Sequence, residues 1–280
     1  MTVLDVLQST TAYFKKRQIE TPRLNAEHLL AHVLKQKRLE LYLEFERQLE
    51  EAELAPLRGL VRRRGEGEPL QHLLGTVEFC GATFLCDKRG MVPRPETEEL
   101  VELLLADVEL WTGNKAIIDI GTGSGVIALS LAAKLPEAAI RAIDISEDAL
   151  TLARENAARL GLDRRVEFGK GNLLENINER FDLVVANLPY ISMEHRQFLS
   201  REVLRDPEAA LFGGERGDEL IRLLIDQARG RLHPNGLLAL EIGADQSGAL
   251  LAFLLEKKYH DIEVKNDYSG TPRFVFARYG

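Results

Sequence analysis

The sequence has no long hydrophobic run. Although 45% of its 280 residues are hydrophobic, no apolar stretch approaches the roughly 18 to 20 residues that cross a bilayer as a helix. The first residues, MTVLDVLQSTTAYFKKRQ, also lack the basic start and apolar middle of a secretory signal peptide. These absences argue against a membrane protein and a secreted protein, and we expect the chain to act in the cytoplasm.

Cysteine is equally scarce, with only Cys80 and Cys86. Neither residue has a second cysteine or a histidine at the spacing of a metal site. The simplest interpretation is two reduced thiols with a structural role, as is usual in a reducing compartment. We therefore expect no metal site and assign the two cysteines no function.

An excess of basic residues is missing as well. The chain carries 36 Lys and Arg against 44 Asp and Glu, which gives a net charge of −8. Proteins that bind nucleic acid through its phosphates usually have a basic surface, because the release of counterions drives that binding. We therefore expect no direct nucleic-acid partner, and we interpret Arg62–Arg64 as a solvated helix end.

Two differently patterned regions follow each other along the chain. From Thr2 to about Leu74 the pattern is helical, with Thr21 and Pro22 as helix-start signals, so we predict a small helical bundle at residues 1–74. The stretch TVEFCGATFLCD then alternates around a glycine like a short hairpin, and MVPRPETEELVELLL runs from a proline-stiffened linker into an amphipathic helix. We place the hairpin and linker at 75–92 and a second domain at 93–280.

In the second domain, apolar strand patterns alternate with helical patterns, which is typical of a parallel sheet covered by helices. The last residues, DIEVKNDYSGTPRFVFARYG, instead indicate two strands joined by a turn. The fold class is therefore α/β, a doubly wound, mostly parallel seven-stranded sheet with a C-terminal antiparallel hairpin. The predicted strands are Ala116–Ile120, Ile140–Ile145, Val166–Phe168, Leu183–Ala186 and Leu237–Ile242, and the predicted helices are Val126–Leu135, Asp148–Leu160, Gly217–Leu232 and Ser247–Lys257.

A glycine loop follows the first predicted strand of this domain, in IIDIGTGSGVIALSLA. Gly121, Gly123 and Gly125 let the backbone turn tightly and approach a ligand, and the next helix offers unpaired N–H groups at its start. Asp144 ends the following strand, where a carboxylate can accept hydrogen bonds from both ribose hydroxyls. Alternatively, the glycines only form a turn and Asp144 caps the next helix. The combination of strand, loop, helix and terminal acid favours a nucleotide-like ligand.

The residue after the third glycine helps to identify the ligand. A dinucleotide fingerprint requires Gly or Ala where the helix packs on the strand, and this chain has Val126. The G-x-G-x-G form, the terminal hairpin and an Asn-x-Pro-Tyr segment after the fourth strand together resemble the S-adenosylmethionine-dependent methyltransferases with a seven-stranded sheet. The resemblance implies S-adenosyl-L-methionine as the cofactor.

Over nearly its whole length the chain resembles the protein-(glutamine-N5) methyltransferases that modify peptide chain release factors. The stretches that carry the resemblance include VPRPETEELVE, DIGTGSGVIALSLA, FDLVVANLPYI and ALFGGERG, preceded by a small helical domain. The resemblance implies a methyl transfer to the glutamine amide of a Gly-Gly-Gln loop, with release factors as protein substrates, and we expect a monomer. It implies that the cofactor is bound by Gly121, Thr122, Gly123, Ser124, Gly125, Asp144, Asn172, Leu173 and Asn187, and that Asn187, Leu188, Pro189 and Tyr190 form the catalytic and substrate-binding segment.

The chemistry of an amide explains why that segment contains no acid or base. An amide nitrogen is a poor nucleophile because its lone pair is delocalised into the carbonyl. The Asn187 side-chain oxygen and the backbone carbonyl of Leu188 could each accept one amide N–H and so aim the lone pair at a methyl donor. Tyr190 could stack on the planar amide and exclude water. Alternatively, the segment is only a turn after a strand and Tyr190 belongs to the core.

Two residues depart from the family pattern. Leu188 stands where the family has the first proline of Asn-Pro-Pro-Tyr, and Asn172 stands where an acid usually follows the third strand. A leucine still supplies the backbone carbonyl, and Pro189 still favours an extended conformation at Leu188. Asn172 could present its amide oxygen to the adenine amino group. Two other functions remain open: a DNA adenine N6-methyltransferase, since similar motifs serve exocyclic amines, and a non-catalytic cofactor-binding protein whose motif has decayed at Leu188.

Overall fold

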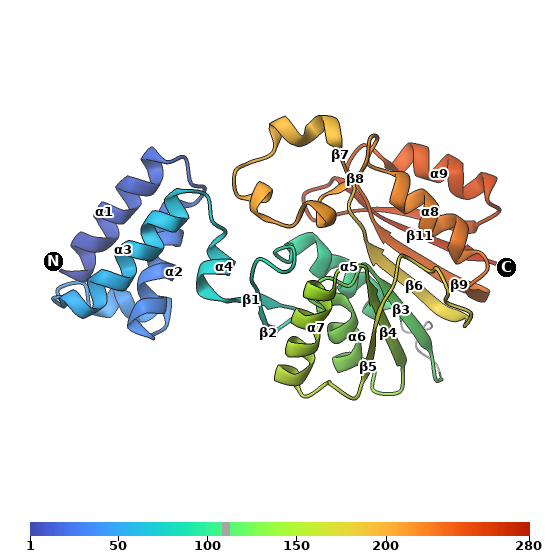
Figure 1. Cartoon of the computed structure of the whole chain (residues 1–280), viewed down its shortest axis with the longest axis horizontal. Coiled ribbons are helices and arrows are strands. Elements are labelled where there is room, and N and C mark those ends of the chain that lie inside the picture. The colour runs from blue at the N-terminus through green and yellow to red at the C-terminus, as the bar shows by residue number, and fades with distance from the viewer. Residues whose placement is uncertain (108–112) are drawn as a thin grey trace. The chain divides into compact units, whose positions relative to one another are not determined.

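The computed structural model describes residues 1–107 and 113–280, which form two compact units (Figure 1). The first unit contains Met1–Thr76 together with Ser200–Arg205, and the second contains the rest of the described chain. In the part of the chain that the structure describes, no helix is both long and apolar enough to cross a membrane.

The first unit is built from helices around one apolar core, in which Phe14, Leu29 and Leu30 are fully buried. Helix α1 begins with a capping box, in which Thr2 and Asp5 each accept a hydrogen bond from the other's backbone N–H. Thr21 precedes α2 as predicted, but its side chain makes no capping hydrogen bond. The helices are α1 (Val3–Lys16), α2 (Pro22–Leu34), the 3-10 helix η1 (Arg38–Leu43), α3 (Glu51–Gly65) and α4 (Leu70–Leu74).

A buried arginine connects the segment Ser200–Arg205 to this unit, so the interpretation of Arg62–Arg64 as a solvated helix end holds for Arg62 and Arg63 but is wrong for Arg64. The guanidinium of Arg64 is 3% exposed and donates to the side-chain oxygen of Asn25 at 2.7 Å, to the backbone carbonyl of Glu68 at 2.9 Å and to the carboxylate of Glu202 at 2.6 Å. Each of its partners accepts a charge-assisted hydrogen bond, which compensates for the burial of the charge. The segment, which includes the 3-10 helix η4 (Val203–Arg205), is therefore held by specific polar contacts.

The second unit is a seven-stranded sheet with helices on both faces (Figure 1). The strand order is β10-β11-β9-β6-β3-β4-β5, and only β11 runs antiparallel to its neighbours. This arrangement confirms the predicted fold class. The strands are β3 (Ala116–Ile120), β4 (Ala139–Asp144), β5 (Val166–Lys170), β6 (Phe181–Asn187), β9 (Leu232–Glu241), β10 (His260–Asn266) and β11 (Pro272–Tyr279).

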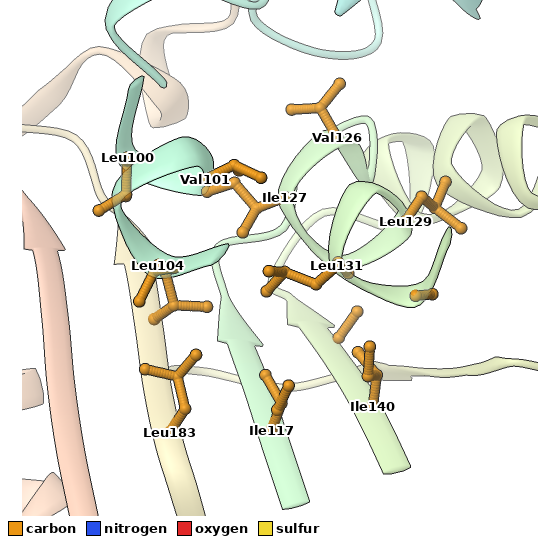
Figure 2. Packing of buried hydrophobic residues seen from close by; sticks show 14 of the residues in the cluster. Leu100, Val101, Leu104, Ile117, Val126, Ile127, Leu129, Leu131, Ile140 and Leu183 are labelled. Carbon is orange, nitrogen blue, oxygen red and sulfur yellow. The ribbon is translucent and has the colours of Figure 1, made fainter. Parts of the chain in front are cut away.

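Apolar residues alternate between the two faces of the sheet. Ile117 and Leu183 belong to the cluster on one face, while Ile118 and Val184 belong to the cluster on the other. Figure 2 shows the first cluster, in which leucine and isoleucine side chains of α5 and α6 cover strands β3, β4 and β6. Burial of each such side chain stabilises the fold by about 1.5–3 kcal/mol. The helices of this unit are α5 (Pro95–Ala106), α6 (Val126–Lys134), α7 (Glu147–Leu160), α8 (Glu219–Ala228) and α9 (Ser247–Glu256).

The predicted hairpin is present as β1 (Thr76–Phe79) and β2 (Ala82–Leu85), which pair with each other. The predicted helix Gly217–Leu232 was too long, because α8 ends at Ala228 and Leu232 already begins β9. A second small sheet was not predicted: β7 (Ile191–Ser192) pairs in parallel with β8 (Phe212–Gly214), and the 3-10 helices η3 (Met193–Phe198) and η5 (Glu208–Ala210) lie in the chain between them.

Candidate functional site

The second unit contains a cavity of about 360 Å³ at the carboxyl ends of β3, β4 and β6. Open parallel sheets bind ligands at this edge, and the volume lies within the range of small-molecule sites. The loops after four different strands, β3, β4, β5 and β6, bring the predicted site residues together here. Those that line the cavity are Gly121, Thr122, Gly123, Ser124, Asp144, Asn172, Leu173, Asn187, Leu188 and Pro189.

The glycine loop is a tight turn between β3 and α6. The N–H groups of Gly121 and Thr122 both donate to the carbonyl of Ile143 on β4, at 2.8 and 3.0 Å. Gly121 has a φ of +71°, and a Cβ built on it would lie 2.9 Å from Cδ2 of Leu188. A residue with a side chain would therefore be strained here, and the Leu188 side chain would have to move aside.

Asp144 holds this loop from the end of β4. One carboxylate oxygen accepts the N–H of Gly123 at 2.8 Å, and the other accepts the N–H of Ser146 at 2.8 Å. Burial raises the pKa of Asp144, while these backbone donors favour the ionised form. The next helix is capped by Ser146, whose hydroxyl accepts the N–H of Ala149. Asp144 is thus a backbone-anchored carboxylate on the cavity wall and is not the helix cap itself.

These residues fit S-adenosylmethionine. Gly121 and Gly123 leave space for a ligand to approach the backbone, and the remaining lone pairs of the Asp144 carboxylate can accept from two ribose hydroxyls. Ile145 and Leu173 add apolar surface to the cavity wall. The NH2 group of Asn172 donates to Glu175 at 2.8 Å, which leaves its side-chain oxygen as the group that can accept from an adenine amine.

The segment Asn187–Tyr190 begins where β6 ends. Leu188 is 4% exposed and packs into the apolar cluster on one face of the sheet. Gly213 of β8 lies directly against this segment, because a Cβ built on it would be 2.2 Å from the carbonyl oxygen of Pro189. The glycine-rich stretch ALFGGERG therefore supports the backbone of the predicted substrate-binding segment.

Two predicted site residues do not line the cavity. Gly125 is the N-cap of α6, with a φ of +84°, and packs against Leu129 and Ala153. The Tyr190 ring packs on the apolar cluster, and its backbone carbonyl accepts from the Gln246 side chain at 2.9 Å. Burial raises the pKa of Tyr190 to about 12, so the phenol is neutral at physiological pH.

Three polar residues near the cavity were missed by the sequence analysis. Thr97 is buried on α5 and lines the cavity. Glu241 is buried at the end of β9, in direct register with Asn187 on β6. Asp119 of β3 accepts from Thr122 at 2.6 Å and from the N–H of Ala128 at 3.2 Å. The signal that could have identified Asp119 and Glu241 was an acidic residue inside an otherwise apolar strand.

Asp206 connects two further motifs. Its carboxylate accepts from the N–H of Val92 at 3.3 Å and from the guanidinium of Arg94 at 2.6 Å. These contacts join the stretch VPRPETE to the stretch RDPEAALFGG.

Among the described residues, no group of three or more His, Cys, Asp or Glu side chains could hold a metal ion.

Comparison with solved structures shows that this chain has a fold like that of solved methyltransferases. The catalytic domain of hMettl16 aligns with a TM-score of 0.56 at 16% identity, over 82% of each chain. The Thermus thermophilus 16S rRNA N2 G1207 methyltransferase, solved with AdoMet and guanosine, aligns with a TM-score of 0.53 at 18% identity, over 73% of this chain and 50% of that chain. At these identities the likeness concerns the fold alone.

Sequence comparison covers the whole chain. Residues 5–75 match the family model of the PrmC N-terminal domain, and residues 112–256 match that of a methyltransferase domain. A release factor glutamine methyltransferase of Geobacter sulfurreducens is 39% identical, over 100% of this chain and 97% of the relative. One of Deinococcus radiodurans is 38% identical over 99% of both chains. The chain belongs to the release factor glutamine methyltransferase family.

Proposed function

We propose that this protein transfers a methyl group from S-adenosylmethionine to the side-chain amide nitrogen of the glutamine in the Gly-Gly-Gln loop of a peptide chain release factor. The observation that carries the proposal is that Asn187, Leu188 and Pro189 line the same cavity as the glycine loop and Asp144. An amide bound by the segment after β6 would therefore lie beside a methyl donor held by the loops after β3 and β4.

When bound, S-adenosylmethionine supplies an electrophilic methyl group on a sulfonium sulfur. The chain supplies orientation. Asn187 Oδ1 and the carbonyl of Leu188 accept the two N–H groups of the glutamine amide, which turns the nitrogen lone pair towards the methyl donor. The same two dipoles stabilise the positive charge that develops on the nitrogen, and loss of one of the two N–H protons then leaves the neutral methylated amide. Tyr190, which directly follows the cavity-lining Pro189, keeps its proposed part in shielding the amide.

The likeness to full-length release factor glutamine methyltransferases favours this function over a DNA adenine methyltransferase and over a non-catalytic binding protein. We also propose how the substrate is held, the oligomeric state and the location in the cell. The helical region at residues 1–74 helps to hold the protein substrate, and the enzyme acts as a monomer in the cytoplasm. The net charge of −8 supports the absence of a direct nucleic-acid partner.

The test is methyl transfer from labelled cofactor to a purified, unmodified release factor. We expect label on the peptide that contains the Gly-Gly-Gln sequence, and none on a release factor whose glutamine is replaced by alanine. Duplex DNA rich in adenine serves as the competing substrate. Asn187→Ala should bind the cofactor and lose most of the activity. Label on DNA alone, or on neither substrate, would overturn the proposal.

A further inference from the structure

A chain of two hydrogen bonds connects the Asn187 side chain to a buried carboxylate. The Asn187 NH2 group donates to the Thr97 hydroxyl at 2.9 Å, and the Thr97 hydroxyl donates to Glu241 Oε2 at 2.7 Å. The three residues come from β6, α5 and β9 (Figure 1). Thr97 and Glu241 are 3% and 1% exposed, so solvent does not compete for the hydrogen bond between them.

The direction of these hydrogen bonds follows from the chemistry of the groups. An ionised carboxylate only accepts, so the single hydroxyl proton of Thr97 is committed to Glu241. The Thr97 oxygen can then only accept from its other neighbour. Asn187 must therefore present its NH2 group to Thr97, and its Oδ1 is left for the cavity.

We propose that Thr97 and Glu241 are positioning residues that fix the side-chain amide of Asn187 with Oδ1 facing the substrate amide. The proposal rests on the function proposed above, because only a substrate that donates N–H groups requires an acceptor there. If the amide of Asn187 turned over, its NH2 group would meet the N–H of the substrate. Two donors would face each other, and the lone pair of the substrate nitrogen would no longer be aimed at the methyl donor.

The protonation state of Glu241 determines whether the amide can turn over. A neutral carboxyl can donate its proton to the Thr97 oxygen, and the hydroxyl proton of Thr97 is then free to donate to Asn187 Oδ1. The orientation of the amide is no longer imposed. Asn187 Oδ1 is therefore held towards the substrate amide only while Glu241 is ionised.

Several groups act on this carboxyl. Burial raises the pKa of Glu241 to about 7, while the side chains of Thr97 and Asn187 lower it as hydrogen-bond donors. Arg273 on β11 lowers the pKa, and Glu96 on α5 raises it. Tyr190, which follows β6, also faces the carboxyl and is neutral at physiological pH. With these neighbours Glu241 ionises near pH 7, so wild-type activity should rise as the pH increases through this value.

The experiment compares Thr97→Val, Thr97→Ser and Glu241→Gln with the wild type on the unmodified release factor. Valine has the shape of threonine without the hydroxyl, and serine keeps the hydroxyl as the matched control. Glutamine at 241 can both accept and donate, so it no longer imposes a direction. We expect Thr97→Val and Glu241→Gln to lower kcat at least about tenfold, with cofactor affinity within about threefold, and Thr97→Ser to stay within about threefold of the wild-type kcat.

Two further measurements distinguish positioning from a merely structural role. The pH profile of kcat/KM should have an acidic limb in the wild type that is absent in Glu241→Gln. The side-chain NH2 signals of Asn187 in the cofactor-free protein, followed by ¹⁵N NMR, should move with pH through the same range in the wild type and stay constant in Glu241→Gln. Melting temperatures identify any variant that does not fold. In that case the NMR titration of the wild type alone decides whether the Asn187 amide responds to the ionisation of Glu241.

The outcomes separate this proposal from the proposed function. A wild type that methylates release factor while Thr97→Val keeps the wild-type kcat would overturn the positioning role alone. The same holds if Thr97→Ser is as impaired as Thr97→Val, or if the acidic limb survives in Glu241→Gln. A wild type without activity on release factor would instead overturn the proposed function, whatever the variants do.

Discussion

The carboxylate of Asp144 accepts a hydrogen bond from the backbone N–H of Gly123 at 2.8 Å. The acid at the end of β4 therefore both faces the cavity and fixes the shape of the glycine loop after β3. Loss of this side chain should affect the cofactor twice, through the missing ribose acceptor and through a less ordered loop.

We expect Asp144→Ala to weaken cofactor binding by about 1.5 to 3 kcal/mol, the range for the loss of hydrogen bonds to a charged group. Titration calorimetry with S-adenosylmethionine measures the effect. Asp148→Ala is the matched control, because Asp148 is exposed in the first turn of α7 and does not line the cavity. Equal affinity in wild type and Asp144→Ala would mean that the ribose binds elsewhere.

Leu188→Pro restores the residue typical of the family. Proline would fix φ near −65° and restrict Asn187 as the residue before a proline, but the carbonyl is present in both proteins. We expect kcat/KM to change by no more than about tenfold, or about 1.4 kcal/mol in the barrier. Leu188→Ala, which loses the packing against Gly121 without the restriction of proline, separates the two effects.

The opposite result for this variant is easily recognised. An inactive wild type and a robustly active Leu188→Pro protein would show that the leucine side chain disables the site. The non-catalytic interpretation would then apply to the natural sequence.

Gly213→Ala should displace the backbone of the substrate-binding segment at Pro189. The new Cβ would lie 2.2 Å from the carbonyl oxygen of Pro189 and 2.3 Å from that of Gly217, and neither backbone atom can move away alone. Because a displacement of about 1 Å can cost a hundredfold in rate, we expect at least about a hundredfold loss of kcat. Gly248→Ala is the control, since nothing lies within 4 Å of its Cβ position. Steady-state kinetics checks the prediction, once melting temperatures show that both variants are folded as stably as the wild type. A kcat of Gly213→Ala equal to that of Gly248→Ala would contradict it.

Asp119 should make stability depend on pH. Burial raises the pKa of Asp119 from 3.8 to about 7, and one of its carboxylate oxygens has no hydrogen-bond partner in the described structure. The folded state therefore binds more protons than the unfolded state between about pH 4 and pH 7. The stability contributed by Asp119 is complete below this range and decreases as the pH rises, by up to about 1.4 kcal/mol per pH unit.

The test is the melting temperature of the wild type and Asp119→Asn between pH 4 and pH 8. Asparagine is neutral throughout, so the melting temperature of the variant should rise relative to that of the wild type as the pH increases. Above about pH 7 the difference between the two melting temperatures should stay constant. A difference that does not vary with pH would show that Asp119 is ionised in the folded protein at all these values.

The main elements of the sheet could be predicted because their signals are local. The predicted strand Ala116–Ile120 coincides with β3, and the predicted C-terminal hairpin corresponds to β10 and β11. The resemblance to a known family also implied that Gly121, Asp144 and Asn187 would share a site. All three line one cavity.

The support behind this site could not be predicted, because it depends on contacts between distant segments. Thr97 stood within VPRPETE, but no local pattern indicated that its hydroxyl would lie between Asn187 and Glu241. The pairing of β7 with β8 escaped prediction for another reason. Two- and three-residue strands are too short to show a period.

The grouping of Ser200–Arg205 with the helical unit bears on how this protein can have evolved. The chain passes from one compact unit to the other after Thr76, after Leu199 and again after Arg205. Recombination at residue 76 alone with a relative that has no carboxylate in place of Glu202 would leave a buried guanidinium without its partner. A hybrid enzyme made with such a relative would have to exchange the helical region and the six residues from Ser200 to Arg205 together.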